Sequence, residues 1–195
     1  SYTLSLHDAL PISPFRSRHD ADWSEIWSLY EASFPACERW REEAYDRAFN
    51  DPLFAADAIR RNGQAVGLLF HWVTPDFDYL EHLAISPRLR GQQLGSLALE
   101  AFCRDNRRRI VLEIDPPEDE ISIRRLHFYQ RLGFVANPHE YIHPSYRSPF
   151  HAHRLVVMSR PEALTDDEAR RFADFIREHV LRYSDHRHPD LPRID

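Results

Sequence analysis

The strand–loop–helix stretch Tyr79–Phe102 (YLEHLAISPRLRGQQLGSLALEAF) most constrains how this chain can fold. Its first seven residues are rich in aromatic and aliphatic side chains, and Pro87 ends the strand that they predict, because proline cannot extend a strand ladder. Apolar residues then recur at helical spacing, which predicts a helix starting near Gln93. The free N–H groups of its first turn, beside Arg88 and Arg90, predict an anion site with phosphate as the anion.

Two interpretations of this loop remain open at this point. In one, Gly91 and Gly95 only permit a tight turn and close helix packing, and the arginines are solvated. In the other, the loop binds a phosphorylated ligand. The G-x-G-x-x-G pattern is absent, and G-x-x-x-x-G-K-[ST] is excluded because the chain has no lysine. The sequence therefore supports neither a Rossmann nor a Walker nucleotide site.

Two motifs resemble the GNAT superfamily of N-acetyltransferases. The segment Arg90–Gly95 (RGQQLG) is similar to the acyl-CoA loop pattern [QR]-x-x-G-x-[GA], except that Gln93 stands where the family usually has glycine. The segment Phe128–Phe134 (FYQRLGF) resembles the F-Y-x-x-L-G-F helix end, which lies near the coenzyme thiol in those enzymes. Ser122 stands where the family has asparagine. The resemblance covers residues 21–160.

The resemblance implies an N-acetyltransferase that moves an acetyl group from acetyl-CoA to a primary amine, by direct attack in a ternary complex. The alternative is a non-catalytic acyl-CoA-binding or sensing domain that uses the same loop. Both place acetyl-CoA on the residues that match or flank the two motifs. These are Leu83, Ala84, Ile85, Arg88, Arg90, Gly91, Gln92, Gln93, Leu94, Gly95, Ser96, Ser122 and Tyr129.

The chemistry needs a base for the amine and an acid for the thiolate. Glu81 is the predicted base, because strand alternation places it on the face of Tyr79 and Leu83 and opposite His82, the competing base. Tyr129 is the predicted acid. The structural alternatives are a Glu81 or His82 that pairs with a helix arginine, and a Tyr129 that bonds a carbonyl.

The acceptor is expected to be a small-molecule or peptide amine, whose identity the sequence does not reveal. Aromatic residues of the N-terminal helices and of the central strand form either core or substrate wall. Phe34, Trp40 and Trp72 are the predicted substrate contacts.

The predicted fold class is α/β, a mixed α+β sheet covered by helices in the order α-α-β-β-β-α-β-α-β-β, with the GNAT-like acyl-CoA N-acyltransferase fold. Asp20 is predicted to cap the first helix, and Asn62-Gly63 to turn a hairpin. Strands at 79–85 and 110–114 should run parallel, joined by a helical crossover, and diverge at their C-terminal ends. The remaining predicted elements are helices over 94–106, 119–132 and 162–183, a strand that begins at 134–135 and a strand over 154–158.

The segment Asn137–His153 is expected to be a long loop with several prolines and histidines. A lid or rim beside the active site is the preferred interpretation, and no metal site is predicted, because no histidine pair has helical metal-ligand spacing and no cysteine joins it. The acetyltransferase domain is expected over 14–160, with an appended helix at 161–183 and a disordered or loosely docked tail at 184–195. Residues 1–13 are expected to be an artefactual arm, because Tyr2–Ile12 resembles a translated sequencing adapter.

The 195 residues are enough for one domain with a substantial core, and the net charge of −6 argues against general attraction to nucleic acid. No apolar run approaches the roughly 20 residues that span a bilayer. Cys37 and Cys103 are too few for a disulfide framework, so a cytoplasmic protein with free thiols is expected. The sequence leaves the oligomeric state open, with a homodimer as one expectation.

Overall fold

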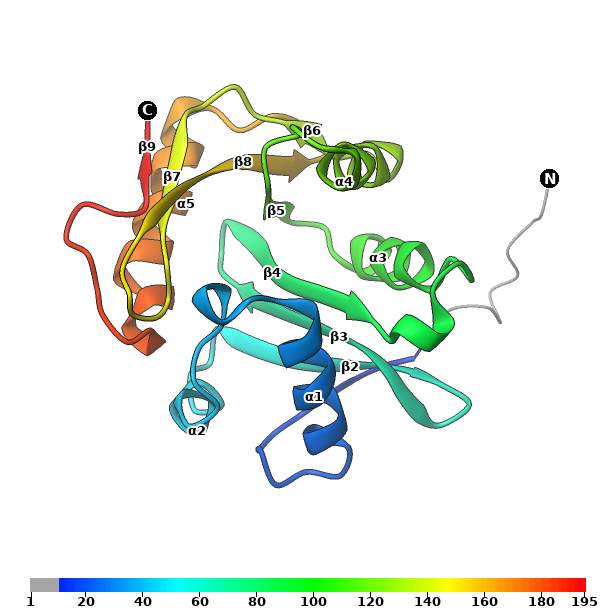
Figure 1. Cartoon of the computed structure of the whole chain (residues 1–195). Helices are drawn as coiled ribbons and strands as arrows, with labels where there is room; N and C mark the ends of the chain where they lie inside the picture. The colour runs from blue at the N-terminus through cyan, green and yellow to red at the C-terminus, as the bar shows by residue number, and fades with distance from the viewer. Residues whose placement is uncertain (1–10) are drawn as a thin grey trace.

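The computed structural model describes residues 11–195, which form one mixed sheet with helices on both faces (Figure 1). The strand order is β1-β2-β3-β4-β5-β8-β7-β9, and β6 pairs with β8. The strands are β1 (Ile12–Pro14), β2 (Phe54–Arg61), β3 (Gln64–Val73), β4 (Phe77–Ile85), β5 (Arg109–Ile114), β6 (Val135–Ala136), β7 (Tyr141–Pro144), β8 (Ala152–Arg160) and β9 (Arg193–Ile194). Residues 1–10, which carry most of the adapter-like sequence, lie outside the described residues.

The helices fall largely where apolar spacing predicted them. They are α1 (Trp23–Ser33), α2 (Ala44–Ala48), α3 (Leu94–Asp105), α4 (Glu120–Arg131) and α5 (Asp166–Glu178), with single 3₁₀ turns η2 (Ala36–Glu38), η3 (Pro87–Leu89) and η4 (Val180–Tyr183). Within the described residues, no helix is both long and apolar enough to cross a membrane.

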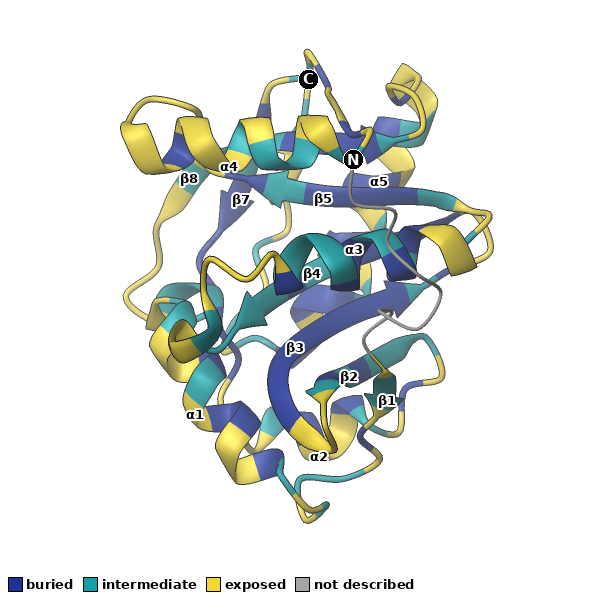
Figure 2. Cartoon of the chain, turned by 90° about the vertical axis from the view of Figure 1, so that its right-hand side faces the viewer, coloured by how far each residue is buried: buried dark blue, intermediate teal, exposed yellow. Residues whose placement is uncertain are grey.

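The two faces of the sheet carry separate cores. Helices α1, α2 and α5 cover one face, where Trp23, Tyr45 and Phe172 are buried against the sheet. Helices α3 and α4 cover the other, where Leu99 packs on the sheet. Strand β3 is buried along almost its whole length (Figure 2), which confirms the prediction that it is central.

The β2–β3 hairpin closes as predicted. Asn62 and Gly63 both have positive φ values, 51° and 77°, which is the conformation that a two-residue type I′ turn requires. This turn sets the register that runs through β3 into β4.

Strands β4 and β5 run parallel, as predicted, but they pair only along Phe77–Tyr79 and Arg109–Val111. Beyond this point β4 stays paired with β3 as far as Ile85, and β5 stays paired with β8 as far as Ile114. The two strands therefore separate at their C-terminal ends, which confirms the predicted divergence. The edges that face each other across this opening keep free backbone hydrogen-bonding groups.

A β-bulge interrupts β4 at Glu81. Phe70 of β3 pairs with His82, and the next residue, His71, pairs with Leu80, so Glu81 has no partner across this ladder. A bulge adds one residue to one strand and breaks the alternation of side chains between the two faces.

The bulge overturns the predicted faces of β4. His82 packs edge-on against Tyr30 of α1, and Glu81 accepts a hydrogen bond from Trp72 in the same core, so the two side chains lie on one side of the sheet. Leu83 packs in the opposite core. The prediction that Glu81 shares a face with Leu83 and opposes His82 is therefore wrong, because strict alternation does not survive the extra residue.

The predicted cap of α1 is also wrong. Asp20 accepts hydrogen bonds from the amides of Arg16 and Ser17, at 2.6 and 3.2 Å, and so closes the preceding turn. The N-cap position is Asp22, whose φ is 70°.

The expected loop at 137–153 contains a strand. β7 pairs antiparallel with β8, and Tyr141 lies opposite Leu155. Prolines flank and end β7. They argued against a strand in the sequence, because proline cannot donate a hydrogen bond within a ladder.

The C-terminal tail is ordered, contrary to the expectation of loose docking. Glu140 and Asp195 exchange two backbone hydrogen bonds, and β9 pairs with β7. Leu191 is buried, so apolar burial and backbone pairing together hold the tail. Helix α5 buries Phe172 and Ile176 in the core of its face, so the appended helix packs on the domain itself.

Candidate active site

The loop between β4 and α3 turns the chain with left-handed residues. The 3₁₀ turn η3 follows β4, Gly91 has φ 81°, and Gln93 has φ 59°. The first helical hydrogen bond of α3 runs from the Leu97 amide to the Gln93 carbonyl, at 3.0 Å. Within the described residues, the preceding amides of α3, from Leu94 on, have no backbone acceptor. They form the positive end of the helix dipole, which suits an anion.

The backbone explains the unusual glutamine of the loop motif. Gln93 occupies the left-handed region that glycine adopts without cost. Its side chain is exposed. The loop therefore keeps the turn that the family pattern achieves with glycine, at the expense of backbone strain.

A cleft of about 500 Å³ opens where β4 and β5 separate. It is lined by β4 and β5, by the α1–α2 connection, by α4 and by the segment around β7 and β8. The lining residues are Ser33, Phe34, Pro35, Cys37, Glu38, Tyr79, Leu80, Glu81, His82, Leu83, Ala84, Ile85, Arg90, Leu112, Glu113, Ile114, Asp115, Arg125, Tyr129, His143, Tyr146, His153 and Leu155.

Tyr129 reaches the cleft from the last turn of α4. Its ring packs edge-on against Phe128 and Phe134, with ring centroids 5.1 and 5.6 Å apart. Its hydroxyl makes no hydrogen bond to any described residue, so the carbonyl-bonded alternative is not what the structure shows. Burial raises its pKa to about 12, so the hydroxyl is a proton donor at neutral pH.

Glu81 lies at the bulge with its carboxylate in the cleft. The Trp72 indole N–H donates to Oε2 at 2.7 Å, and the Tyr146 hydroxyl donates to Oε1 at 2.6 Å. Burial raises its pKa to about 7, although both hydrogen bonds oppose the shift. No arginine pairs with it in the described part of the chain, unlike the structural alternative.

His82 lies in a different setting. Its ring is wedged between Tyr30 and Phe34, with ring centroids 4.8 and 4.5 Å away, and Nε2 lies 3.1 Å from the Glu38 carbonyl oxygen. Because a carbonyl only accepts, Nε2 carries the hydrogen. Burial lowers the pKa of His82 to about 3, so the ring stays neutral.

Several lining residues were not singled out from the sequence, among them Glu38, Glu113, His143 and Tyr146. Burial raises the pKa of Glu38 to about 7, with the nearby charge of Asp115 adding to the shift. The sequence does contain a signal for Glu113, which is the only carboxylate in the apolar strand RIVLEI. His143 and Tyr146 lie in the segment that was expected to be a lid or rim beside the active site, and both line the cleft, although no pattern singled out these two residues within it.

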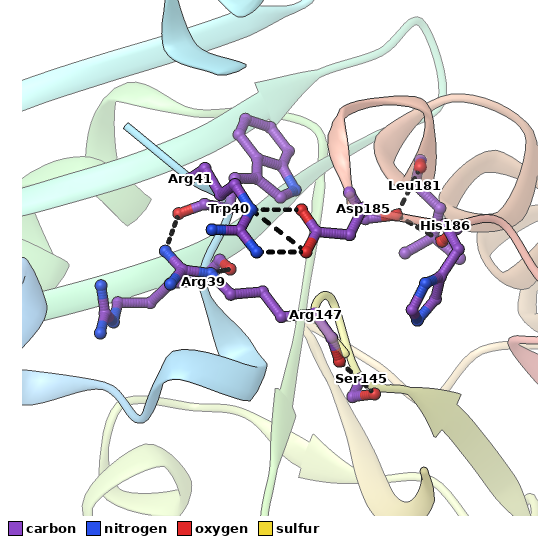
Figure 3. Close-up of polar contacts among 9 residues, drawn as sticks. Arg39, Trp40, Arg41, Ser145, Arg147, Leu181, Asp185 and His186 are labelled. Carbon is purple, nitrogen blue, oxygen red and sulfur yellow. Dashed lines mark hydrogen bonds and ion pairs between the residues drawn. The ribbon is translucent and has the colours of Figure 1, made fainter. Parts of the chain in front are cut away.

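The loop that carries Tyr146 is clamped from two directions (Figure 3). The Arg147 guanidinium donates to the carbonyl oxygens of Arg39 and Trp40, at 3.1 and 2.9 Å. The Tyr146 carbonyl accepts from the Asp185 amide at 2.9 Å, and the Asp185 carboxylate pairs with Arg41. These contacts join the α1–α2 connection, the loop and the C-terminal tail.

The predicted contact residues divide into those that reach the cleft and those that do not. The strand residues Leu83, Ala84 and Ile85 line it, as do Arg90 and Tyr129 of the predicted coenzyme set and Phe34 of the predicted acceptor wall. The others of the coenzyme set lie outside the lining: Ser122 on α4, and, on the loop and the start of α3, Arg88, Gly91, Gln92, Gln93, Leu94, Gly95 and Ser96.

Three predicted residues have other contacts. Ser122 is committed to the capping box of α4, where its hydroxyl lies 2.8 Å from the Asp119 carboxylate. Trp40 and Trp72 are buried core residues, and Trp72 reaches the site only through Glu81. No cluster of three metal-ligating side chains occurs among residues 11–195.

Comparison with known proteins supports one family. The sequence profile of the Acetyltransferase (GNAT) family matches residues 23–134, more than half of the chain. A search of curated proteins gave no significant match. A solved structure assigned to the GNAT acetyltransferases, from Bacteroides thetaiotaomicron, is 25% identical with a TM-score of 0.82, over 88% of this chain and 98% of that one.

Two more distant structures share the fold. A GNAT family acetyltransferase from Elizabethkingia anophelis with acetyl-CoA bound is 15% identical, with a TM-score of 0.55, over 78% of this chain and 97% of that one. An Arabidopsis thaliana protein in complex with the bisubstrate analogue CoA-Ac-MVNAL is 16% identical, with a TM-score of 0.55, over 78% and 98%. The divergent strands, the amide-lined turn before α3 and the family profile agree: this chain belongs to the GNAT family of acetyltransferases and is an acyltransferase with acetyl-CoA as its acyl donor.

Proposed function

We propose that this chain transfers an acetyl group from acetyl-CoA to a primary amine that is cationic in solution, by direct attack in a ternary complex. The observation that carries this proposal is the contrast across the cleft between β4 and β5. One part of the lining offers Arg90, whose loop continues into the unpaired helix amides of residues 94–96 outside the lining, and another part offers the carboxylates of Glu38, Glu81 and Glu113. Donor and acceptor can therefore occupy opposite sides of one opening.

The donor side suits a coenzyme with a diphosphate. The free amides at the start of α3 and the Arg90 guanidinium supply donors and positive charge. The unpaired edge of β4 at Leu83–Ile85 faces the cleft, where a pantetheine amide chain can bond to it as an added strand does. The thioester then points toward Tyr129.

The acceptor side suits a positive charge. Of the two arginines that line the cleft, Arg125 is neutralised by Asp115, with Nη1 3.0 Å from Oδ2. Glu38 and Glu81 are enclosed, so their charges are screened less than surface charges are. A field of this sign raises the local concentration of ammonium groups.

Proton transfer is assigned to Glu81 and Tyr129. A pKa of about 7 places Glu81 where a base is effective at neutral pH, and both its oxygens already accept hydrogen bonds, so it acts on the amine through a water molecule. His82 is the weaker candidate, because its Nε2 is used by a carbonyl and its pKa is about 3. As the amine attacks the thioester carbonyl and the C–S bond breaks, the Tyr129 hydroxyl protonates the thiolate.

The acceptor chain is assigned to the wall formed by Phe34 and the α1–α2 connection. Phe34 is the only one of the three predicted aromatic contacts that lines the cleft. Trp40 and Trp72 act behind that wall, where Trp72 holds Glu81 in place.

The decisive experiment measures thiol release from acetyl-CoA with a panel of primary amines, together with acetyl-CoA affinity by calorimetry. Tyr129→Phe is expected to lower kcat by about 10²-fold, in the range of lost acid catalysis, with little change in acetyl-CoA Kd. Tyr183→Phe is the matched control, because that hydroxyl donates to Asp51 and does not line the cleft. Acetyl-CoA binding without turnover of any amine would instead support the sensing domain and overturn the proposal.

A further inference from the structure

His143 has one ring nitrogen bonded and one free. Its side chain is only 6% exposed, and Nδ1 lies 2.7 Å from the Pro144 carbonyl oxygen. A carbonyl only accepts, so Nδ1 carries the hydrogen and Nε2 of the neutral ring presents a lone pair. Nε2 is buried and has no hydrogen-bond partner among the described residues.

Glu113 faces that lone pair from β5. Its Oε1 accepts a hydrogen bond from the Tyr79 hydroxyl, and its side chain is 10% exposed. Its Oε2 lies 3.8 Å from His143 Nε2, which is too far for a hydrogen bond. Like Nε2, this oxygen is buried without a hydrogen-bond partner in the described part of the chain.

With a neutral His143 ring, two buried acceptors thus face each other at the cleft wall, and the buried Tyr141 hydroxyl, a donor close to Glu113, is likewise without a hydrogen-bond partner among the described residues. An unsatisfied buried acceptor costs about 1–3 kcal/mol, and more when it is charged, so such a pair is unusual unless a ligand completes it. A nitrogen about 2.9 Å from each atom would span the gap and could donate one N–H to each acceptor, after a shift of the side chains that cover both atoms. An ammonium group has the charge and the hydrogens to do so.

We propose that Glu113 and His143 form the seat for the acceptor's primary ammonium group, which donates one N–H to Glu113 Oε2 and another to His143 Nε2. This inference rests on the proposed function and assigns the residues that select and orient its acceptor. The seat distinguishes amines by the number of their N–H bonds. A quaternary ammonium carries the same charge but has no hydrogen to donate, so it is rejected.

The support around the seat fits this role. The Tyr79 hydroxyl fixes the Glu113 carboxylate, and the Pro144 carbonyl fixes the tautomer of His143. The rings of Tyr146 and His153 lie next to His143, with centroids 5.5 and 5.7 Å away. Burial lowers the pKa of His153, so that neighbour stays neutral and does not compete as a cation.

The test uses the full chain and the best amine of the panel, with Glu113→Gln and His143→Asn as variants. Each is expected to raise the KM of the amine at least about tenfold, the effect of losing a charged hydrogen bond, with acetyl-CoA Kd unchanged. In the Glu113→Gln variant, the new side-chain amide can also donate its own N–H to His143 Nε2, in place of the proposed ammonium group. Glu113→Asp should recover part of the loss. The controls are Glu140→Gln and His151→Asn, which change the same residue types at exposed positions outside the cleft.

A second arm separates the seat from general charge attraction. n-Butylamine and butyltrimethylammonium are compared as inhibitors of acetylation of that amine, and the quaternary ion is expected to bind at least about tenfold more weakly. Equal inhibition by both ions, or turnover that the two variants leave intact, overturns the seat while the acetyltransferase proposal stands. Acetyl-CoA binding with no turnover of any amine overturns both. A thermal melt of each variant with acetyl-CoA confirms that the chain is folded.

Discussion

The proposed donor side and the proposed acceptor side of the cleft are built in different ways. The donor side joins Arg90 and the β4 edge to backbone amides just outside the lining, all from one continuous stretch that leads into α3. The acceptor side is made of side chains from the α1–α2 connection, from β4, β5 and β7 and from the Tyr146 loop. Glu81 and Tyr146 meet there although they are 65 residues apart in the sequence. A backbone site keeps its function while most of its side chains vary. A side-chain site can be changed to fit a new acceptor without disturbing the donor.

This difference predicts that each substitution in the cleft changes the parameters of one ligand, the amine or acetyl-CoA, and leaves those of the other unchanged. Changes on the acceptor side should alter amine parameters and leave acetyl-CoA affinity intact, and changes on the donor side should do the reverse. A substitution that altered both equally would show that the sides are coupled.

The largest expected effect follows from Glu81→Gln. Loss of the proposed base should lower kcat at neutral pH by about 10²–10⁴-fold, with acetyl-CoA Kd unchanged. The wild-type rate should rise with pH through about 7, as the Glu81 carboxyl loses its proton, and the variant should lack this rise. Stopped-flow or steady-state thiol release between pH 5.5 and 8.5 measures both. A variant that keeps its rate and its pH profile would remove Glu81 from the mechanism.

The next effect concerns stability, and it contrasts two neighbours on β4. Burial raises the pKa of Glu81 from 4.5 to about 7, so the folded state holds this proton more tightly and stability falls as pH rises from 4.5 through 7. Burial lowers the pKa of His82 from 6.5 to about 3, so the unfolded state holds this proton more tightly and stability falls as pH drops from 6.5 toward 3.

Urea unfolding of Glu81→Gln and His82→Asn checks these opposite slopes. Relative to wild type, the free energy of unfolding of the Glu81 variant should improve by up to roughly 3 kcal/mol between pH 4.5 and 7.5. That of the His82 variant should improve as pH falls below 6.5. Parallel pH curves for wild type and both variants would contradict the burial of these groups.

A smaller effect is expected on the donor side. Arg90→Ala should raise acetyl-CoA Kd by about three- to tenfold, because one exposed guanidinium near a phosphate is worth about 1 kcal/mol, and the effect should shrink in high salt. Arg88→Ala is the matched control, since Arg88 does not line the cleft. Calorimetry at two salt concentrations measures both. If Arg88→Ala weakened acetyl-CoA binding more than Arg90→Ala did, Arg88 and not Arg90 would be the arginine that contacts the phosphate.

The donor side could be predicted from the sequence because local patterns encode it. The strand that ends before Pro87, the glycine turn and the helix with its row of apolar residues follow one another directly in the sequence. The crossover rule then predicts correctly that β4 and β5 are parallel. Likewise Asn62-Gly63 determined its hairpin. These features depend on neighbours in the chain and not on distant partners.

The acceptor side could not be predicted in the same way. The bulge at Glu81 depends on how β3 and β4 pair, and no alternation rule anticipates it. His143 meets Glu113 only because β7, hidden among prolines, adds to the sheet beyond β8. Even the start of α5 was misplaced, although Thr165 and Glu168 form a capping box that the sequence shows. Side chains brought together by sheet order need the fold before they can be assigned.

The smallest expected effect tests the backbone character of the donor side directly. Gln93 holds φ 59°, a conformation that costs a non-glycine residue about 1 kcal/mol, and its side chain is exposed. Gln93→Gly should therefore change the free energy of unfolding by less than about 1 kcal/mol, as relieved strain offsets the added freedom of the unfolded chain. Acetyl-CoA Kd should stay within about twofold of wild type, because the backbone amide that is proposed to bind phosphate is retained. Gln92→Gly is the control at a neighbouring exposed position without positive φ. If Gln93→Gly weakened acetyl-CoA binding tenfold while Gln92→Gly did not, the glutamine side chain would be a ligand of the coenzyme, and the donor side would depend on side chains as the acceptor side does.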